Sequence, residues 1–110
     1  MGIGIGFGKV ILFNEHFVVF GLPAIASAIG AKTTASVERR PGSGVELVDN
    51  RPETKGYKAE KFTQQKESLD RMLKFMNIDI TRNAFKITLA GDLIAASGVG
   101  ASAASCAAIA

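Results

Sequence analysis

Cysteine and histidine are nearly absent from this chain of 110 residues, which contains one of each, Cys106 and His16. A single cysteine excludes an internal disulfide framework, and together with one histidine it cannot form a His/Cys metal cluster within one chain. Tryptophan is absent as well. Because 47% of the residues are hydrophobic and the formal net charge is only +3, the composition predicts a folded domain and excludes a disordered chain. The scarcity of cysteine favours a reducing, cytoplasmic location.

Charged residues are scarce at both ends of the chain. Residues 1–31 carry only Lys9 and Glu15, and residues 93–110 carry none. The second of these stretches is about as long as a membrane-spanning helix. It consists mostly of small residues, however, and its serines and glycines disfavour insertion into a bilayer. The N-terminus also lacks the basic region of a signal peptide. We therefore expect neither a membrane segment nor a secretion signal.

Most of the charges lie between residues 38 and 86, where basic and acidic side chains alternate. The basic residues could form a patch for nucleic acid. The interleaved acids favour a solvated face instead, and the phenylalanines, which lie mostly in apolar segments, provide no stacking platform for bases. We expect no nucleic-acid partner. This group of basic residues consists of Arg39, Arg40, Arg51, Lys55, Lys58 and Lys61.

The first half of the chain predicts strands. Glycine alternates with larger apolar residues over 2–8, which predicts a strand with one nearly bare face. Residues 9–13 continue it as a buried strand. Residues 32–39 alternate like a half-exposed strand, and residues 45–48, after a Pro/Gly/Ser turn, are expected to return antiparallel as a hairpin. For residues 24–29 periodicity does not decide between a strand and a helix.

The second half predicts helices around one strand. Apolar residues recur on one face of residues 60–76, which predicts an amphipathic helix, and Asn77 can end it in a left-handed conformation. Residues 85–89 alternate as a strand, and the Ala-rich residues 103–110 favour a helix. No linker divides the chain. The sequence thus predicts one α+β domain with a layered sheet.

A glycine-rich turn, Ser97-Gly98-Val99-Gly100-Ala101-Ser102, opens the last helix. The first N–H groups of a helix lack internal partners and carry partial positive charge, so such a turn can bind the anionic oxygens of phosphate. The Ser102 hydroxyl could contact a phosphate or a magnesium ion. The spacing fits neither a Walker A loop nor the G-x-G-x-x-G pattern. The alternative is a small-residue helix that packs tightly on a sheet after a flexible turn.

A second group of polar residues lies in the apolar N-terminal part: Lys9, Glu15 and His16. Isolated ionisable groups among apolar residues cost free energy unless they are paired or exposed. One interpretation is a surface loop with a Lys–Glu pair and a solvated histidine. The other is a polar pocket in which Lys9 neutralises phosphate while Glu15 and His16 hold hydroxyl groups or a carboxylate. Cys106 is expected to be a small buried thiol in the helix.

The two segments that contain these residues resemble two motifs of one known family. Residues 8–24 read Gly-Lys-Val-Ile-Leu-Phe-Asn-Glu-His-Phe-Val-Val-Phe-Gly-Leu-Pro-Ala, which resembles the opening of the mevalonate kinases within the GHMP kinases, usually Gly-Lys-(Val/Ile)-Ile-Leu-x-Gly-Glu-His-x-Val-Val-x-Gly-x-Pro-Ala. Residues 97–104 resemble the phosphate loop of the family, usually Gly-Leu-Gly-Ser-Ser-Ala-Ala. Asn14 replaces a glycine, Phe7 a proline and Ala101 the first serine of these patterns.

The resemblance implies transfer of the γ-phosphoryl group of ATP, with Mg²⁺, to the primary alcohol of mevalonate. It assigns Lys9 to catalysis and substrate binding, and Glu15 and His16 to mevalonate binding. It assigns residues 97–102 to the ATP phosphates, with Ser102 on magnesium. Such chemistry needs positioning and charge neutralisation, which a helix N-terminus, a lysine and a metal can provide.

The resemblance further implies an N-terminal GHMP-kinase domain over residues 1–110, with helices on one face of the sheet, incomplete at its C-terminus. We expect the C-terminal domain and the catalytic acid to come from other sequence, either the rest of the same polypeptide or a separate domain. A homodimer is also possible within this family. The alternative functions are a non-catalytic module that binds nucleotide or phosphate, and another GHMP kinase such as phosphomevalonate kinase.

Overall fold

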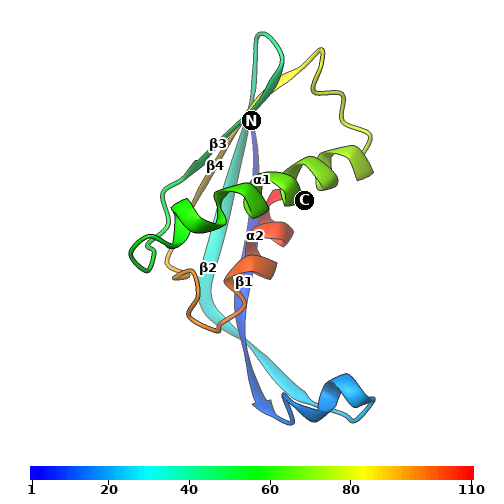
Figure 1. Ribbon diagram of the computed structural model, residues 1–110, viewed down its shortest axis with the longest axis vertical. Helices are drawn as coiled ribbons and strands as arrows, with labels where there is room; N and C mark the ends of the chain where they lie inside the picture. The colour runs from blue at the N-terminus through cyan, green and yellow to red at the C-terminus, as the bar shows by residue number, and fades with distance from the viewer.

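The computed structural model describes all residues from 1 to 110 as one α+β unit, with both helices on the same face of a four-stranded sheet (Figure 1). This confirms the predicted fold class. In chain order the elements are β1 (Gly2–Phe13), the 3-10 helix η1 (Phe17–Phe20), β2 (Ile25–Arg40), β3 (Gly44–Asp49), α1 (Tyr57–Phe75), β4 (Ala84–Gly91) and α2 (Ala101–Ile109).

The strand order is β1-β2-β4-β3, and it corrects one sequence prediction. Strand β2 pairs antiparallel with β1 and with β4, whereas β3 pairs in parallel with β4. The expected hairpin between residues 32–39 and 45–48 is therefore wrong. The chain does reverse direction after β2, but β4 lies between β2 and β3, and α1 provides the crossover that a parallel pair requires.

The main core lies between the sheet and α1. Leu69 and Leu73 of α1 pack with Ile87 and Leu89 of β4, and all four are at least 93% buried. These two leucines lie one turn apart, as the predicted apolar face requires. The helix begins three residues earlier than expected, at Tyr57, and Asn77 has the left-handed φ of 55° that its position predicts.

Helix α2 lies on the bare glycine face of β1. A Cβ atom added to Gly4 would lie 2.0 Å from the backbone oxygen of Ala108, and one added to Gly6 would lie 2.0 Å from that of Ala104. Only strand residues without side chains permit this approach. The alternating glycines of β1 thus provide the surface on which α2 lies. No helix of the structure is both long and apolar enough to cross a membrane.

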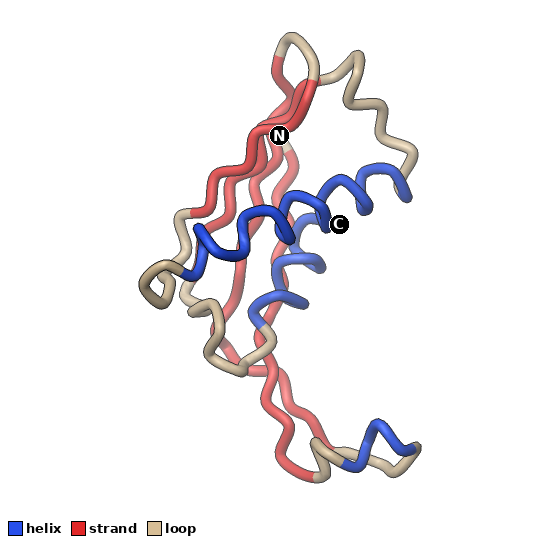
Figure 2. Tube along the Cα trace, viewed as in Figure 1, coloured by secondary structure: helices blue, strands red, loops and turns tan.

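The C-terminal end of β1 and the N-terminal end of β2 extend away from the main body as a long hairpin, and η1 lies in the connection between them (Figure 2). This projection explains why the molecule extends over 48 Å and has a radius of gyration of 15.5 Å, against about 13 Å for a compact domain of this length. Of residues 24–29, for which the sequence left strand or helix open, 25–29 are strand and begin β2, and residues 17–20 are 3-10 helix. The expectation that residues 9–13 are buried is wrong at Leu12 and Phe13, which are 66% and 63% exposed.

Candidate functional site

The glycine-rich turn forms a tight loop that opens α2. Gly98 and Gly100 both have φ of 75°, and Ala96 also adopts a left-handed φ, of 63°. These angles suit glycine and strain a residue with a side chain. Gly100 is the N-cap residue, and no side chain caps the helix there. The first N–H groups of α2 therefore lack a capping partner within the protein and can donate to an anion.

Lys9 of β1 lies directly against this loop. The Lys9 backbone N–H donates to the carbonyl oxygen of Val99 at 2.9 Å. A Cβ atom built on Gly100 would lie 3.1 Å from Lys9 Cγ and 3.4 Å from Lys9 Cε, so the lysine side chain runs along Gly100. The structure thus brings Lys9 to the N-terminus of α2. These residues are more than 85 positions apart in the sequence, and β1 places a positive charge beside the free N–H groups.

The two serines of the loop differ in their surroundings. Ser102 is exposed in the first turn of α2. The Ser97 hydroxyl instead donates to the backbone oxygen of Ile94 at 2.6 Å and stabilises the turn itself. Ala101 and Ala104 are buried, so their small size serves helix packing. For these two residues the structure agrees with the alternative interpretation of the sequence, a small-residue helix that packs tightly on a sheet.

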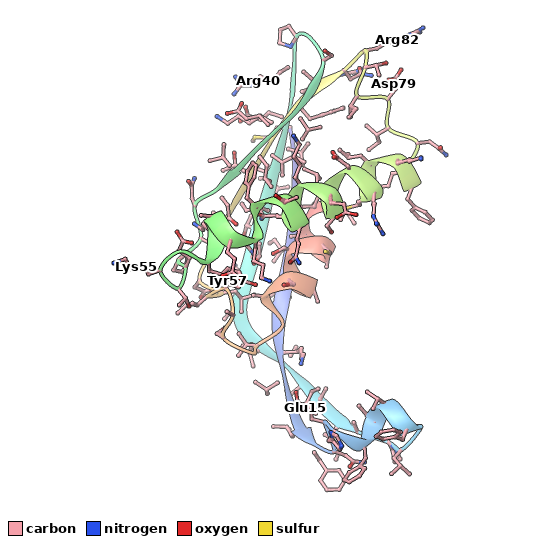
Figure 3. The ribbon with its side chains drawn as sticks, in the orientation of Figure 1. Glu15, Arg40, Lys55, Tyr57, Asp79 and Arg82 are labelled. Atoms are coloured by element: carbon pink, nitrogen blue, oxygen red, sulfur yellow. The ribbon has the colours of Figure 1, made fainter.

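Glu15 and His16 lie apart from this loop. Glu15 lies at the tip of the projecting hairpin, far from both α1 and α2 (Figure 3). From Lys9 to Phe13 alone, the strand extends about 13 Å at 3.3 Å per residue. His16 packs edge-on against Phe17, with ring centroids 5.1 Å apart, and is exposed. The structure therefore joins Lys9 to the glycine-rich loop but does not join Glu15 and His16 to it.

Beside the loop lies a buried ion pair that the sequence reasoning missed. The Arg51 guanidinium donates from Nε to Asp49 Oδ1 at 2.9 Å and from Nη2 to Asp49 Oδ2 at 2.6 Å. Both side chains are about nine-tenths buried, at 8% and 11% exposure. Arg51 Nη1 also donates to the Ser105 hydroxyl of α2. The expectation of a solvated basic face is therefore wrong for Arg51. The sequence does contain a signal for this ion pair, since Asp49 and Arg51 carry opposite charges two positions apart.

Residues of α1 complete this cluster. Lys58 Nζ donates to the backbone oxygens of Asp49 at 2.8 Å and of Arg51 at 2.5 Å. Gln65 Nε2 donates to Asp49 Oδ2 at 3.2 Å. The cluster thus connects the end of β3 to α1 and α2. The cluster forms one wall of a groove, called here the α1–α2 groove, which extends to residues 97–102, the phosphate-loop candidate. The groove is also lined by Tyr57, Lys61, Ser102, Ser105 and Cys106. The expected burial of Cys106 is wrong, because this thiol is exposed.

The surroundings of Asp49 change its acidity. Burial opposes ionisation, but hydrogen bonds from the Arg51 side chain and backbone and from Gln65, together with the Arg51 charge, outweigh it. The pKa of Asp49 therefore lies below its ordinary value of 3.8.

A pH-dependent stability follows from this cluster. Because the folded state lowers the pKa of Asp49, its contribution to stability is complete above the unfolded value of about 3.9 and is lost as the pH falls through the folded value. We expect the free energy of unfolding in urea to decrease below about pH 4 and to do so less steeply in Asp49→Asn. Equal slopes in the wild type and the variant would contradict this prediction.

Comparisons with known proteins agree with this fold. No protein-family model and no curated protein matches the sequence. Among solved structures, mevalonate kinase from L. major in complex with R-mevalonate is 40% identical with a TM-score of 0.88, over 96% of this chain and 32% of that one. The enzyme from methicillin-resistant Staphylococcus aureus is 27% identical with a TM-score of 0.63, over 98% of this chain and 36% of that one. The Methanococcus jannaschii enzyme shares the fold at 24% identity and a TM-score of 0.73, over 96% of this chain and 37% of that one.

The resemblance seen in the sequence motifs is confirmed by these structures. The matched region is the N-terminal domain of mevalonate kinases, and the chain spans about a third of the length of those proteins. The likeness to the L. major enzyme extends over nearly the whole of this chain. The chain therefore has the fold of the N-terminal domain of mevalonate kinases and is similar in sequence to the L. major enzyme over that domain.

Proposed function

We propose that this chain supplies the N-terminal, phosphate-binding part of a mevalonate kinase, which transfers the γ-phosphoryl group of ATP to the primary alcohol of mevalonate. The observation that carries the proposal is the position of Lys9 along Gly100, beside the uncapped N-terminus of α2. Its support is the likeness to the L. major enzyme, whose structure contains R-mevalonate. Phosphoryl transfer depends mainly on positioning and on stabilising charge, and these groups can do both.

The loop fits the phosphates of a nucleotide. Residues 97–102 would surround the phosphate oxygens, because Gly98 and Gly100 hold the backbone in left-handed conformations and leave no Cβ atom in the way. Lys9 would neutralise the charge that develops on the transferred group. Ser102 is the candidate ligand for Mg²⁺, which would supply positive charge to the phosphates when bound. The chain holds no cluster of three acidic, cysteine or histidine residues that could complete a metal site.

Mevalonate is the substrate that Glu15 and His16 would bind. Both residues are exposed between β1 and η1, at the end of the hairpin, where they can contact a ligand or another part of the protein. The exposed apolar residues around them suit contact with further polypeptide. We propose that the rest of the kinase, including the catalytic acid, covers this hairpin and closes the substrate site.

A chimera tests this function. The matching part of the L. major enzyme would be replaced by this chain, whose 40% identity over 96% of its residues makes the exchange feasible. We expect this chimeric enzyme to phosphorylate mevalonate with Mg-ATP and to reject phosphomevalonate. A folded chimera that binds Mg-ATP but phosphorylates neither substrate would favour the alternative of a non-catalytic module. Phosphorylation of phosphomevalonate would favour the other GHMP kinase.

The 110-residue chain alone is expected to be inactive. The closing domain and the catalytic acid would be missing, and a proton acceptor near the alcohol is needed for efficient transfer. A coupled assay of ADP release with mevalonate, Mg-ATP and the purified chain measures this. Turnover in the range of about 1–100 per second that is typical of kinases would contradict the prediction.

Replacement of Ser102 tests the metal contact. Ser102→Ala is expected to weaken Mg-ATP binding and reduce its dependence on Mg²⁺, while the fold stays intact because alanine favours helices. Isothermal titration at several magnesium concentrations measures both effects. Ser43→Ala, which removes an exposed hydroxyl in the turn between β2 and β3, is the matched control. Equal affinity and equal metal dependence in Ser102→Ala would exclude the metal role.

A further inference from the structure

The ion pair with Asp49 leaves Nη1 of the Arg51 guanidinium available for a further contact. Nε and Nη2 are both engaged by the two carboxylate oxygens, at 2.9 and 2.6 Å, which fixes the plane and the orientation of the guanidinium. The Asp49 carboxylate is itself held by Gln65 from α1. Nη1 therefore points in a fixed direction, and in that direction it donates to the Ser105 hydroxyl.

Ser105 also forms a hydrogen bond with the first residue of α2. Its hydroxyl donates to the backbone oxygen of Ala101 at 2.8 Å, one turn back along the helix. Ala101 is the first residue of α2 and lies between Gly100 and Ser102 of the phosphate-loop candidate. Two consecutive hydrogen bonds thus connect Arg51, outside the helix, with the residue at which the loop becomes helix.

Helix α2 packs mainly through alanines: Ala101 and Ala104 lie in a cluster with Leu93, and Ala108 lies in the main core. Apolar packing is non-directional, so a hydrogen bond can define the position of the helix more closely. A helix of nine residues is marginally stable by itself and depends on packing. On the sheet side it meets the bare glycine face of β1, which offers no side chain to hold it in register. Besides Arg51, the side-chain hydrogen-bond partner of α2 outside the helix is Ser68 of α1, whose Oγ lies 4.0 Å from Cys106 Sγ, a weak contact.

We propose that Arg51 is a positioning residue that acts through Ser105 to hold the N-terminus of α2, and with it residues 97–102, in the place where they bind phosphate. The ligand part of this inference rests on the proposed function. The mechanical part concerns the position of the loop and stands on the hydrogen bonds alone.

The test uses four single variants of the chain and one double variant. Ser105→Ala removes the hydroxyl that Arg51 contacts, whereas Ser105→Thr keeps a hydroxyl and is the conservative rescue. Arg51→Lys keeps the positive charge but loses the planar guanidinium group, which can bond to Asp49 and Ser105 at the same time. Arg71→Lys is the matched control, because Arg71 forms its ion pair with Glu67 within α1 and its side chain is 79% exposed. The readouts are the amide ¹H–¹⁵N shifts of residues 97–102 and the dissociation constant for Mg-ATP.

We expect Arg51→Lys and Ser105→Ala each to shift the loop amides and to weaken Mg-ATP binding by about tenfold, since small displacements of binding groups have large effects. Ser105→Thr and Arg71→Lys should resemble the wild type. Because both residues act in one chain of contacts, the double variant of Arg51→Lys and Ser105→Ala should bind about as weakly as Ser105→Ala alone.

Loop amides that do not move in Arg51→Lys and Ser105→Ala would overturn the inference, as would strictly additive losses in the double variant. If Arg51→Lys does not fold, Ser105→Ala decides, because alanine keeps the helix intact. Wild-type chain that fails to bind Mg-ATP would contradict the proposed function instead. In that case the amide shifts alone still confirm or exclude the positioning by Arg51.

Discussion

Gly6→Ala is expected to destabilise the protein by about 3 kcal/mol or more, since a new Cβ atom cannot be accommodated in a closely packed interior without moving the backbone. The added Cβ would lie 2.0 Å from the backbone oxygen of Ala104 and 2.8 Å from its carbonyl carbon. The obstacle is helix backbone and not a flexible side chain, so α2 as a whole must move away from β1. The expected change includes the loss of apolar contacts between the helix and the sheet.

Gly2→Ala is the matched control for this prediction. Gly2 belongs to the same strand, but a Cβ atom there would meet nothing within 4 Å. We expect its free energy of unfolding to differ from the wild type by no more than about 0.5 kcal/mol. Urea unfolding followed by circular dichroism measures both variants. A Gly6→Ala protein as stable as Gly2→Ala would show that α2 does not lie closely against β1.

The same residues show why part of the fold could be predicted. Alternation of glycine with Ile3, Ile5 and Phe7 predicts a strand with a bare face, and a bare face implies a close neighbour on that side. Local periodicity also predicts the helix that carries Leu69 and Leu73. These features depend on residues that are near in sequence, and local pattern reports them well.

Strand order and the buried ion pair could not be predicted in this way. The turn after β2 shows that the chain reverses, but not that β4, more than 30 residues later, would occupy the place beside β2. Arg51 is surrounded in the sequence by charged and polar residues, which favours exposure. Its burial arises because α1 and α2 both cover the end of β3, and that depends on tertiary packing.

In the candidate site, too, the sequence predicts individual residues, whereas their contacts depend on tertiary structure. The loop from Ser97 to Ser102 was predicted from its glycines, and Lys9 from its isolation among apolar residues. Their contact follows from the backbone hydrogen bond between Lys9 and Val99, which fixes β1 against the loop. Glu15 and His16 have no comparable contact with the loop, because the hairpin extends away from the main body. Their role in binding mevalonate stays a prediction.

Lys9→Met should reduce kcat/KM of the chimeric enzyme by about a thousandfold, the effect of removing one group that stabilises charge in the transition state. Methionine keeps an unbranched side chain that can lie along Gly100 as the lysine does, so the packing stays while the charge is lost. Lys9 forms no ion pair within the chain, and we therefore expect a change of less than about 1 kcal/mol in stability.

Two further variants separate the effect of position from that of charge. Lys32→Met removes an exposed lysine of β2, whose backbone, and not its side chain, bonds with Asp92, and it should leave kcat/KM unchanged. Lys9→Arg keeps the charge on a larger, planar group and should restore little activity if the ammonium must reach a confined position. Steady-state kinetics with mevalonate and Mg-ATP, together with urea unfolding, measure all three. Near wild-type turnover in Lys9→Met would mean that the N–H groups of α2 neutralise the phosphate without this lysine, and that Lys9 serves to hold β1 against the loop.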